Sequence, residues 1–186
     1  MVDDDRLPLP ADLTPGQRDA VARISAGPRG AVFGPFVPLL RSPELMTRLQ
    51  LVGEYLRFES ALPDHIRELI ILLVAREWDQ GFEWGHHVPL ARKAGLPEAV
   101  ITAVGASDGP TGPDDVTAVW RLADELVGRH TVGDATFTAV ADRLGEAGVV
   151  EVVATIGYYT TLAMTMNTAR TPVPGDYERI PDRKRS

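Results

Sequence analysis

Chemistry-bearing side chains gather in the segment 82–87, which reads Phe-Glu-Trp-Gly-His-His. Glu83 and His87 are four residues apart, so on a helix they share one face. A carboxylate that accepts one imidazole N–H fixes the tautomer and leaves the other ring nitrogen free for proton transfer. The same spacing is also found in surface Glu–His pairs, which add only about 0.2–0.5 kcal/mol to helix stability. The spacing alone leaves both interpretations open.

A second carboxylate, Glu68, lies directly before the uncharged apolar run 69–75. A run that is apolar all round indicates a buried helix, and a glutamate on such a helix is rare without a partner. On one straight helix Glu68 and Glu83 would lie about 22 Å apart. A break at Gly81 would let the second helix fold back, so that Glu68 could approach His87.

This folding would create a carboxylate–imidazole–carboxylate cluster, an arrangement suited to proton transfer. We therefore predict Glu68, Glu83 and His87 as catalytic residues. The alternative for Glu68 is a buried ion pair with Arg57 or Arg67. Either arginine could also bind a substrate carboxylate in a bidentate manner.

Trp84 is one of several aromatic residues that could line a pocket for a planar organic molecule, although a place in the core explains it equally well. Gln80 and His86 lie beside the catalytic residues in the sequence. The predicted substrate-binding residues are Arg57, Arg67, Gln80, Trp84 and His86.

Helix-start signals recur along the chain, as in Thr14-Pro15, Ser42-Pro43 and Pro63-Asp64. The helix over 43–58 is expected to bury Leu45, Leu49, Val52 and Leu56. The segment 30–40 indicates an irregular loop, and no segment shows strand alternation. We predict an all-α, single-domain bundle. About eight helices are expected, over 15–26, 43–58, 63–78, 82–93, 97–106, 114–129, 134–144 and 149–170. An N-terminal arm with the first helix covers 1–30, the helical domain 31–170 and a C-terminal tail 171–186.

Composition excludes several classes of function. The 186 residues include no cysteine, which rules out disulfides, Fe–S clusters and cysteine nucleophiles. The net charge of −7 disfavours nucleic-acid binding, because the phosphate backbone would be repelled. The segment 152–169 is uncharged and reaches the lower length limit of a membrane span. Its threonines favour a core or subunit-contact helix, so we expect a cytoplasmic protein without a membrane segment.

A metal site is not expected. Glu83-x-x-His86 has the spacing of di-iron bundles, but that architecture needs a second Glu-x-x-His, which this sequence lacks. Nor is there a dinucleotide-binding or phosphate-binding glycine motif. We expect neither a metal nor another cofactor, and a metal-dependent oxygenase or hydrolase stays as a further alternative.

The region 34–96 resembles the carboxymuconolactone decarboxylase family, within the alkylhydroperoxidase D-like superfamily. The segments that carry the resemblance are Gly34-Pro35-Phe36, Ser42-Pro43-Glu44-Leu45, Arg67-Glu68-Leu69-Ile70-Ile71-Leu72, Phe82-Glu83-Trp84 with His87, and 91–95. The resemblance implies an all-helical fold that assembles as a homo-oligomer, a trimer or a hexamer built from trimers, with sites near subunit contacts.

The family's peroxidase branch uses a glutamate, a Cys-x-x-Cys pair and a histidine. By resemblance these fall on Glu68, on Gln80 with Glu83, and on His87, so the proton relay is kept and the thiol peroxidase chemistry is lost. The decarboxylase branch implies a cofactor-free lyase that acts on a small unsaturated lactone or carboxylic acid by general acid/base catalysis. A non-catalytic oligomeric ligand-binding protein, or a proton-shuttling isomerase or lyase of secondary metabolism, remains as an alternative.

Overall fold

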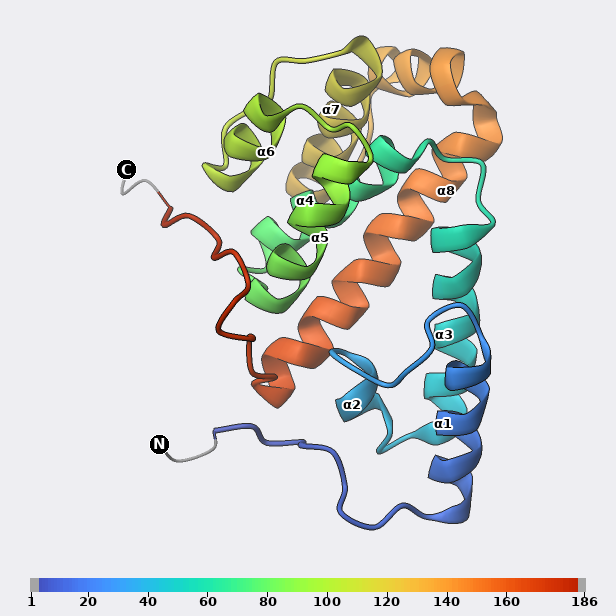
Figure 1. The fold of residues 1–186 in the computed structure, drawn as a ribbon. Coiled ribbons are helices and arrows are strands. Elements are labelled where there is room, and N and C mark those ends of the chain that lie inside the picture. The colour runs from blue at the N-terminus through green and yellow to red at the C-terminus, as the bar shows by residue number, and fades with distance from the viewer. Residues whose placement is uncertain (1–3, 184–186) are drawn as a thin grey trace.

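The computed structural model describes residues 4–183, which form helices and contain no strand (Figure 1). The predicted all-α class is therefore confirmed. The outer residues of the predicted arm and tail, 1–3 and 184–186, lie outside the described part. The helices are α1 (Pro15–Ala26), α2 (Phe36–Leu39), α3 (Pro43–Phe58), α4 (Asp64–Glu77), α5 (Gly81–Lys93), α6 (Glu98–Gly105), α7 (Asp114–Arg129) and α8 (Asp134–Ala169).

The helix starts follow the sequence signals closely. At α1 the hydroxyl of Thr14 accepts a hydrogen bond from the Gln17 amide, and the Gln17 side chain accepts one from the Thr14 amide. This reciprocal pair satisfies two amides that a helix start leaves unpaired. The expected loop 30–40 differs, because it contains the short α2. The last two expected helices are both present as the two parts of α8, which are separated by a kink at Gly145, where φ is +74° and ψ is 168°.

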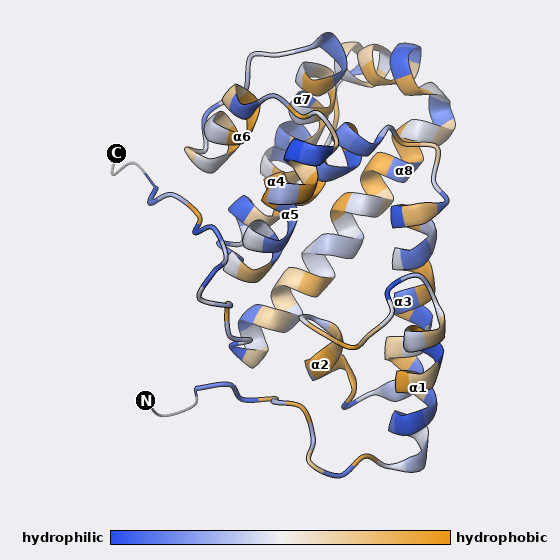
Figure 2. Ribbon diagram, viewed as in Figure 1, coloured by the Kyte–Doolittle hydropathy of each residue, from blue (hydrophilic) through white to orange (hydrophobic). Residues whose placement is uncertain are grey.

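Helix α4 is the centre of the bundle and packs against α5, α6, α7 and α8. Its residues 69–72 are completely buried, as expected for a helix that is apolar all round. Figure 2 shows hydrophobic residues also on α2 and along α8, the long helix that runs diagonally across the view. The histidine segment on α5 therefore lies beside the driest part of the protein.

The prediction for the buried face of α3 was wrong in part. Leu56 is buried, but Leu45 and Val52 are each 48% exposed, and the inner face carries Gln50 and Gly53 instead. Helix α3 has apolar residues on two sides, and the choice between them is made by its contacts with α1 and α8. Periodicity within the helix carries no information about that choice.

Helix α8 is long and apolar enough to cross a membrane by length and composition. Within the described chain it is the one helix that meets this test, and 56% of its most apolar window is buried by the rest of the protein. Thr155, Thr161 and Thr165 of this helix each donate to the carbonyl one turn back, as Thr155 does to Glu151. These features are those of a core helix in a helical bundle.

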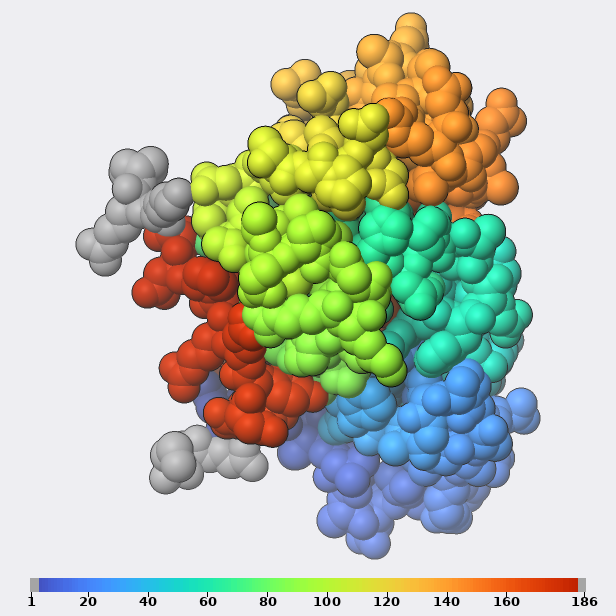
Figure 3. Space-filling view, turned by 45° about the horizontal axis from the view of Figure 1, so that its top comes forward, coloured from blue at the N-terminus to red at the C-terminus, as the bar shows by residue number. Residues whose placement is uncertain are grey.

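The C-terminal tail lies along α5, where Figure 3 shows it (red) against the green surface. Arg92 on α5 forms ion pairs with Glu98 and with Glu178 of the tail. Farther along, the guanidinium of Arg183 donates hydrogen bonds to the carbonyls of Arg76 and Glu77. The tail therefore covers one side of the helix that carries the histidines.

Candidate active site

The break between α4 and α5 is built by a three-residue connection. Asp79 adopts a left-handed conformation with φ of +46°, and Gln80 then caps α5, its side-chain oxygen accepting hydrogen bonds from the Phe82 and Glu83 amides. The Gln80 amide nitrogen donates to the side chain of Asn167 on α8, at 2.9 Å. These bonds fix the start of α5 so that it folds back along α4.

The fold brings the three predicted catalytic residues together. His87 is 2% exposed, and Glu68 and Glu83 are each 4% exposed. The imidazole Nδ1 of His87 lies 2.7 Å from Oε2 of Glu68, and its Nε2 lies 3.3 Å from Oε2 of Glu83. The predicted approach of Glu68 to His87 across the helix break is thereby confirmed, whereas the catalytic roles stay a prediction.

The two carboxylates determine the charge of His87. Burial by itself lowers the pKa of His87, but the charge and hydrogen bond of Glu68, assisted by Glu83, outweigh burial and raise the pKa above its ordinary value. An imidazolium has two N–H donors, and each ring nitrogen here faces a carboxylate. Both carboxylates therefore favour the protonated form of the buried His87, which is the state required of a general acid.

The alternative partner of Glu68 is present only at longer range. The Nε of Arg67 lies 3.9 Å from Oε1 of Glu68, while its Nη2 donates to Asp64 at 2.8 Å. Oε2 of Glu68 therefore contacts His87, whereas its Oε1 has Arg67 as a more distant neighbour. The short contact with His87 is the stronger of the two interactions.

A small cavity of about 20 Å³ adjoins His87 and Glu83. Two predicted substrate-binding residues, Arg57 and His86, line this cavity. Tyr159 on α8 presents its ring at a right angle to that of His87, with 5.5 Å between the ring centroids. The remaining lining residues are Arg29, Phe33, Pro35, Phe36, Phe82 and Leu162.

His86 differs from its neighbour in protonation. Its ring packs near Phe33 and Phe82, and its Nδ1 lies 3.3 Å from the hydroxyl of Tyr177 in the C-terminal tail. Burial, followed by the like charge of His87 and Arg57, lowers the pKa of His86 to about 4. The cavity therefore holds two imidazoles whose pKa values are shifted in opposite directions, that of His86 downward and that of His87 upward.

Three predicted substrate-binding residues do not line this cavity. Gln80 caps α5 and donates a hydrogen bond to Asn167. Arg67 donates a hydrogen bond to Asp64. Trp84 is 1% exposed and lies in the core, close to Gly105 of α6. Each of these side chains has a structural place, and we do not retain them as cavity residues.

Sequence reasoning missed Arg29 and Phe33, which reach the cavity from the connection between α1 and α2. Most of that connection was expected to be an irregular loop, which by itself assigns no role to Phe33. No spacing rule relates the loop to His87, more than fifty residues later in the sequence. The described residues also contain no group of three or more His, Asp or Glu side chains placed to hold a metal ion.

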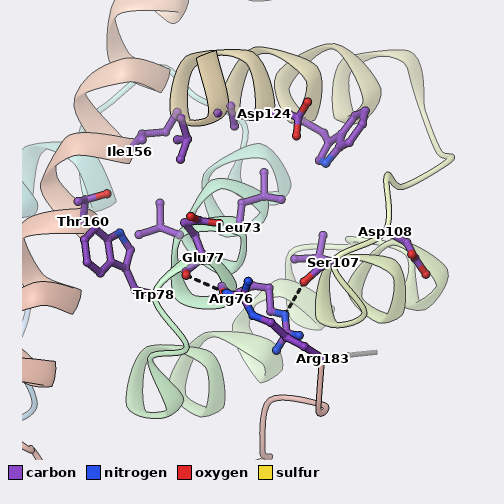
Figure 4. A pocket seen from close by; sticks show the side chains of 16 residues that line it. Leu73, Arg76, Glu77, Trp78, Ser107, Asp108, Asp124, Ile156, Thr160 and Arg183 are labelled. Carbon is purple, nitrogen blue, oxygen red and sulfur yellow. Dashed lines mark hydrogen bonds between the residues drawn. The ribbon is translucent and has the colours of Figure 1, made fainter. Parts of the chain in front are cut away.

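Two larger cavities lie away from His87. One, of about 620 Å³, is bordered mainly by the C-terminal tail. The other, of about 280 Å³, lies between α4, α7 and α8, where Figure 4 shows Trp78 and Ile156 on one side and Ser107 and Arg183 on another. Its buried Arg76 donates to Ser107 at 2.8 Å and to the carbonyl of Pro181. Neither cavity is lined by a histidine, so we place the chemistry at the smaller one.

Solved structures define the class of this fold as alkylhydroperoxidase D-like. A peroxidase-related protein with an alkylhydroperoxidase D core, from Ralstonia eutropha JMP134, has a TM-score of 0.73 at 18% identity, with 92% of this chain and 93% of that chain covered. A protein of unknown function from Agrobacterium tumefaciens has a TM-score of 0.65 at 20% identity, with 74% and 96% covered. The debrominase Bmp8, solved in complex with 2,3,4-tribromopyrrole, has a TM-score of 0.68 at 12% identity, with 91% of both chains covered.

The model of the Carboxymuconolactone decarboxylase family matches residues 43–125, which confirms the family resemblance. This range contains all three residues of the buried cluster. No curated protein sequence gives a significant match. The family match and the cluster together indicate a catalytic role on this scaffold, and family and fold are typical of soluble proteins.

Proposed function

We propose that the protein is a cofactor-free lyase, similar to carboxymuconolactone decarboxylase, that acts on a small unsaturated lactone or carboxylic acid. The observation that carries the proposal is the imidazole of His87 held between two buried carboxylates at the edge of a cavity. Such a group can deliver a proton to carbon without sulfur, and this sequence has no cysteine.

In the proposed reaction the bond between the substrate's carboxyl group and its neighbouring carbon breaks. CO₂ leaves, and the electron pair enters an extended enolate. His87 then donates the proton on Nε2, which is the nitrogen with the longer carboxylate contact and faces Glu83 of the cavity, to carbon, forming the new C–H bond. Developing negative charge beside a fixed positive group is stabilised in a site without bulk water. Glu68 and Glu83 hold the imidazole in position and favour its return to the protonated state.

The test is CO₂ release and the ultraviolet change of the carboxymuconolactone, measured for wild type, His87→Gln and His65→Gln. His65 also contacts a carboxylate, Asp115 at 2.8 Å, but lies away from the cavity, so its variant is the matched control. We expect wild type and His65→Gln to release CO₂ and His87→Gln to lose about 100-fold or more in rate, the typical value of general acid catalysis.

Two results would contradict the proposal. Equal rates for wild type and His87→Gln would remove His87 from the mechanism. A wild-type protein that releases no CO₂ would exclude the decarboxylase activity. Incorporation of solvent deuterium into the lactone without CO₂ release would identify an isomerase instead, and lactone binding without either reaction would identify a ligand-binding protein.

We further propose that the protein is a cytoplasmic homo-oligomer, a trimer or a hexamer. Support comes from apolar side chains that α3 and α8 expose. The two helices are linked directly, because the hydroxyl of Tyr55 on α3 donates a hydrogen bond to Glu151 on α8 at 2.6 Å. Surfaces of this kind commonly mark subunit contacts. The exposed residues are Leu45, Leu51, Val52, Tyr55 and Phe58 on α3, and Val150, Val153 and Met164 on α8.

Sedimentation measurements test this assembly. Val52→Asp should shift the mass toward the monomer, whereas Phe137→Asp, at an equally exposed position in the first segment of α8, should leave it unchanged. A monomeric wild type would contradict the proposal.

A further inference from the structure

Arg29 is positioned beside the cavity by contacts with aromatic side chains. Its guanidinium carbon lies 4.6 Å from the ring centroid of Phe36, and its Nη2 donates a weak hydrogen bond to the hydroxyl of Tyr158 at 3.5 Å. Its Nε is buried and finds no hydrogen-bond partner within the described structure. A buried donor without a partner is costly, and here it belongs to a side chain that lines the cavity beside His87.

Arg57, in the last turn of α3, lines the same cavity. Gly53 lies four residues earlier and therefore on the same face of the helix. A Cβ atom at Gly53 would overlap the Tyr158 hydroxyl and lie 2.5 Å from Nη2 of Arg29. The absence of a side chain at this position thus lets Arg29 approach the face of α3 that carries Arg57.

Neither arginine is neutralised by a neighbouring acid. Among residues 4–183 no carboxylate lies within 4.0 Å of Arg29 or Arg57, and Glu68 and Glu83 are both engaged by His87. When His87 is in its protonated form, it and the two arginines carry three positive charges against the two negative charges of these glutamates, which leaves one positive charge in excess. Two guanidinium groups that face one cavity repel each other until an anion lies between them.

We propose that Arg29 and Arg57 form a binding subsite for the carboxylate of an unsaturated or aromatic acid, an inference that rests on the function proposed above and specifies its substrate class. A carboxylate brings the single negative charge that balances the excess, whereas a phosphate monoester brings nearly two. Guanidinium groups also match the planar geometry of a carboxylate. The neighbouring rings of Phe33 and Phe36 provide an apolar contact for the rest of the acid.

The size of the cavity adds one condition to the proposal. About 20 Å³ is room for roughly one water molecule, so an acid enters only when the half-buried covering side chains move. Arg29 and Phe33 belong to the connection before α2 rather than to a helix. We therefore expect the connection between α1 and α2 to move away from the cavity when an acid enters, after which the carboxylate pairs with Arg29.

Benzoate, an unreactive aromatic carboxylate, serves as the probe, with benzamide as its uncharged counterpart. Binding is measured by calorimetry for wild type, Arg29→Gln, Arg29→Lys, Arg57→Gln and Arg48→Gln. Arg48 lies on α3 but pairs with Glu44 at the surface, so it is the matched control. We expect saturable benzoate binding by wild type and Arg48→Gln, a Kd raised about 10- to 100-fold in both glutamine variants, and partial recovery in Arg29→Lys. Benzamide should bind weakly and equally to all of them.

The outcomes separate this inference from the proposed function. If wild type binds no benzoate up to its solubility limit, or if Arg29→Gln binds it as well as wild type, the subsite is refuted even where lactone turnover is observed. If benzoate binding depends on both arginines but the lactone releases no CO₂, the subsite stands and the decarboxylase assignment falls. Tighter binding of phenyl phosphate than of benzoate would overturn the choice of a carboxylate.

Discussion

Replacing Glu68 by glutamine tests the coupling on which the candidate site depends. The substitution keeps the shape of the side chain and an oxygen that can accept from His87, but removes the charge that lies 2.7 Å from the imidazole Nδ1. A hydrogen bond to a charged group contributes about 1.5–3 kcal/mol. At 1.36 kcal/mol per pKa unit, Glu68→Gln should lower the pKa of His87 by about 1–2 units.

The titration is followed by NMR of the imidazole C–H signals, which His87→Gln assigns. The control is Asp115→Asn, which alters the other close histidine–carboxylate pair and should leave the His87 titration in place. If His87 titrates at the same pH in wild type and Glu68→Gln, the two residues are not coupled and the proton-transfer interpretation is refuted.

Stability provides an independent readout of the same change. Since the folded pKa of His87 is raised, the stabilisation it provides is complete below the ordinary histidine pKa of about 6.5 and is lost as pH rises through the folded value. The free energy of unfolding of wild type should therefore exceed that of Glu68→Gln most near pH 6. The difference should shrink toward alkaline pH.

Three further predictions concern neighbouring residues. His86 has a pKa lowered to about 4, so the stability linked to its neutral form is present above about pH 6.5 and is lost as pH falls through 4. In urea unfolding, the decrease in the free energy of unfolding between about pH 6.5 and 4 should be about 1–2 kcal/mol smaller for His86→Asn than for wild type. This figure allows for solvent screening at a partly exposed site. Gly53→Ala should destabilise the protein by about 1–3 kcal/mol in thermal unfolding, because its methyl group would overlap Tyr158, whereas Gly128→Ala, with open space around it, should not. Tyr177→Ala should raise the pKa of His86 toward its ordinary value, because burial is the leading cause of the shift; an unchanged His86 titration would show that Tyr177 does not shield it.

The helices could be predicted because the residues at and next to each helix end determine where the helix starts and stops. Thr14 and Gln17 form the capping box of α1, with Pro15 at its first position, and the apolar run 69–75 produces the buried centre of α4. The convergence of Glu68 and His87 could also be predicted, because a helix break between two such residues leaves few ways to bury both. These inferences need only the chain within about twenty residues.

The parts that could not be predicted depend on contacts between distant segments. The exposure of Val52 follows from how α3 packs on α1 and α8, and neither contact is encoded within α3. Arg29 reaches the cavity because Gly53, in a different helix, has no side chain to block it. Residues 27–30 read Gly-Pro-Arg-Gly, a sequence typical of a turn, and nothing in it relates Arg29 to His87.

The tail that passes over α5 has a consequence for access to the histidine segment. Tyr177 packs against Gly85, where an added Cβ would lie 2.5 Å from the Cβ of Tyr177 and 2.7 Å from its ring, and its hydroxyl lies 3.3 Å from Nδ1 of His86. Detachment of this tail from α5 would open the histidine segment to water on that side and reduce the burial that lowers the pKa of His86.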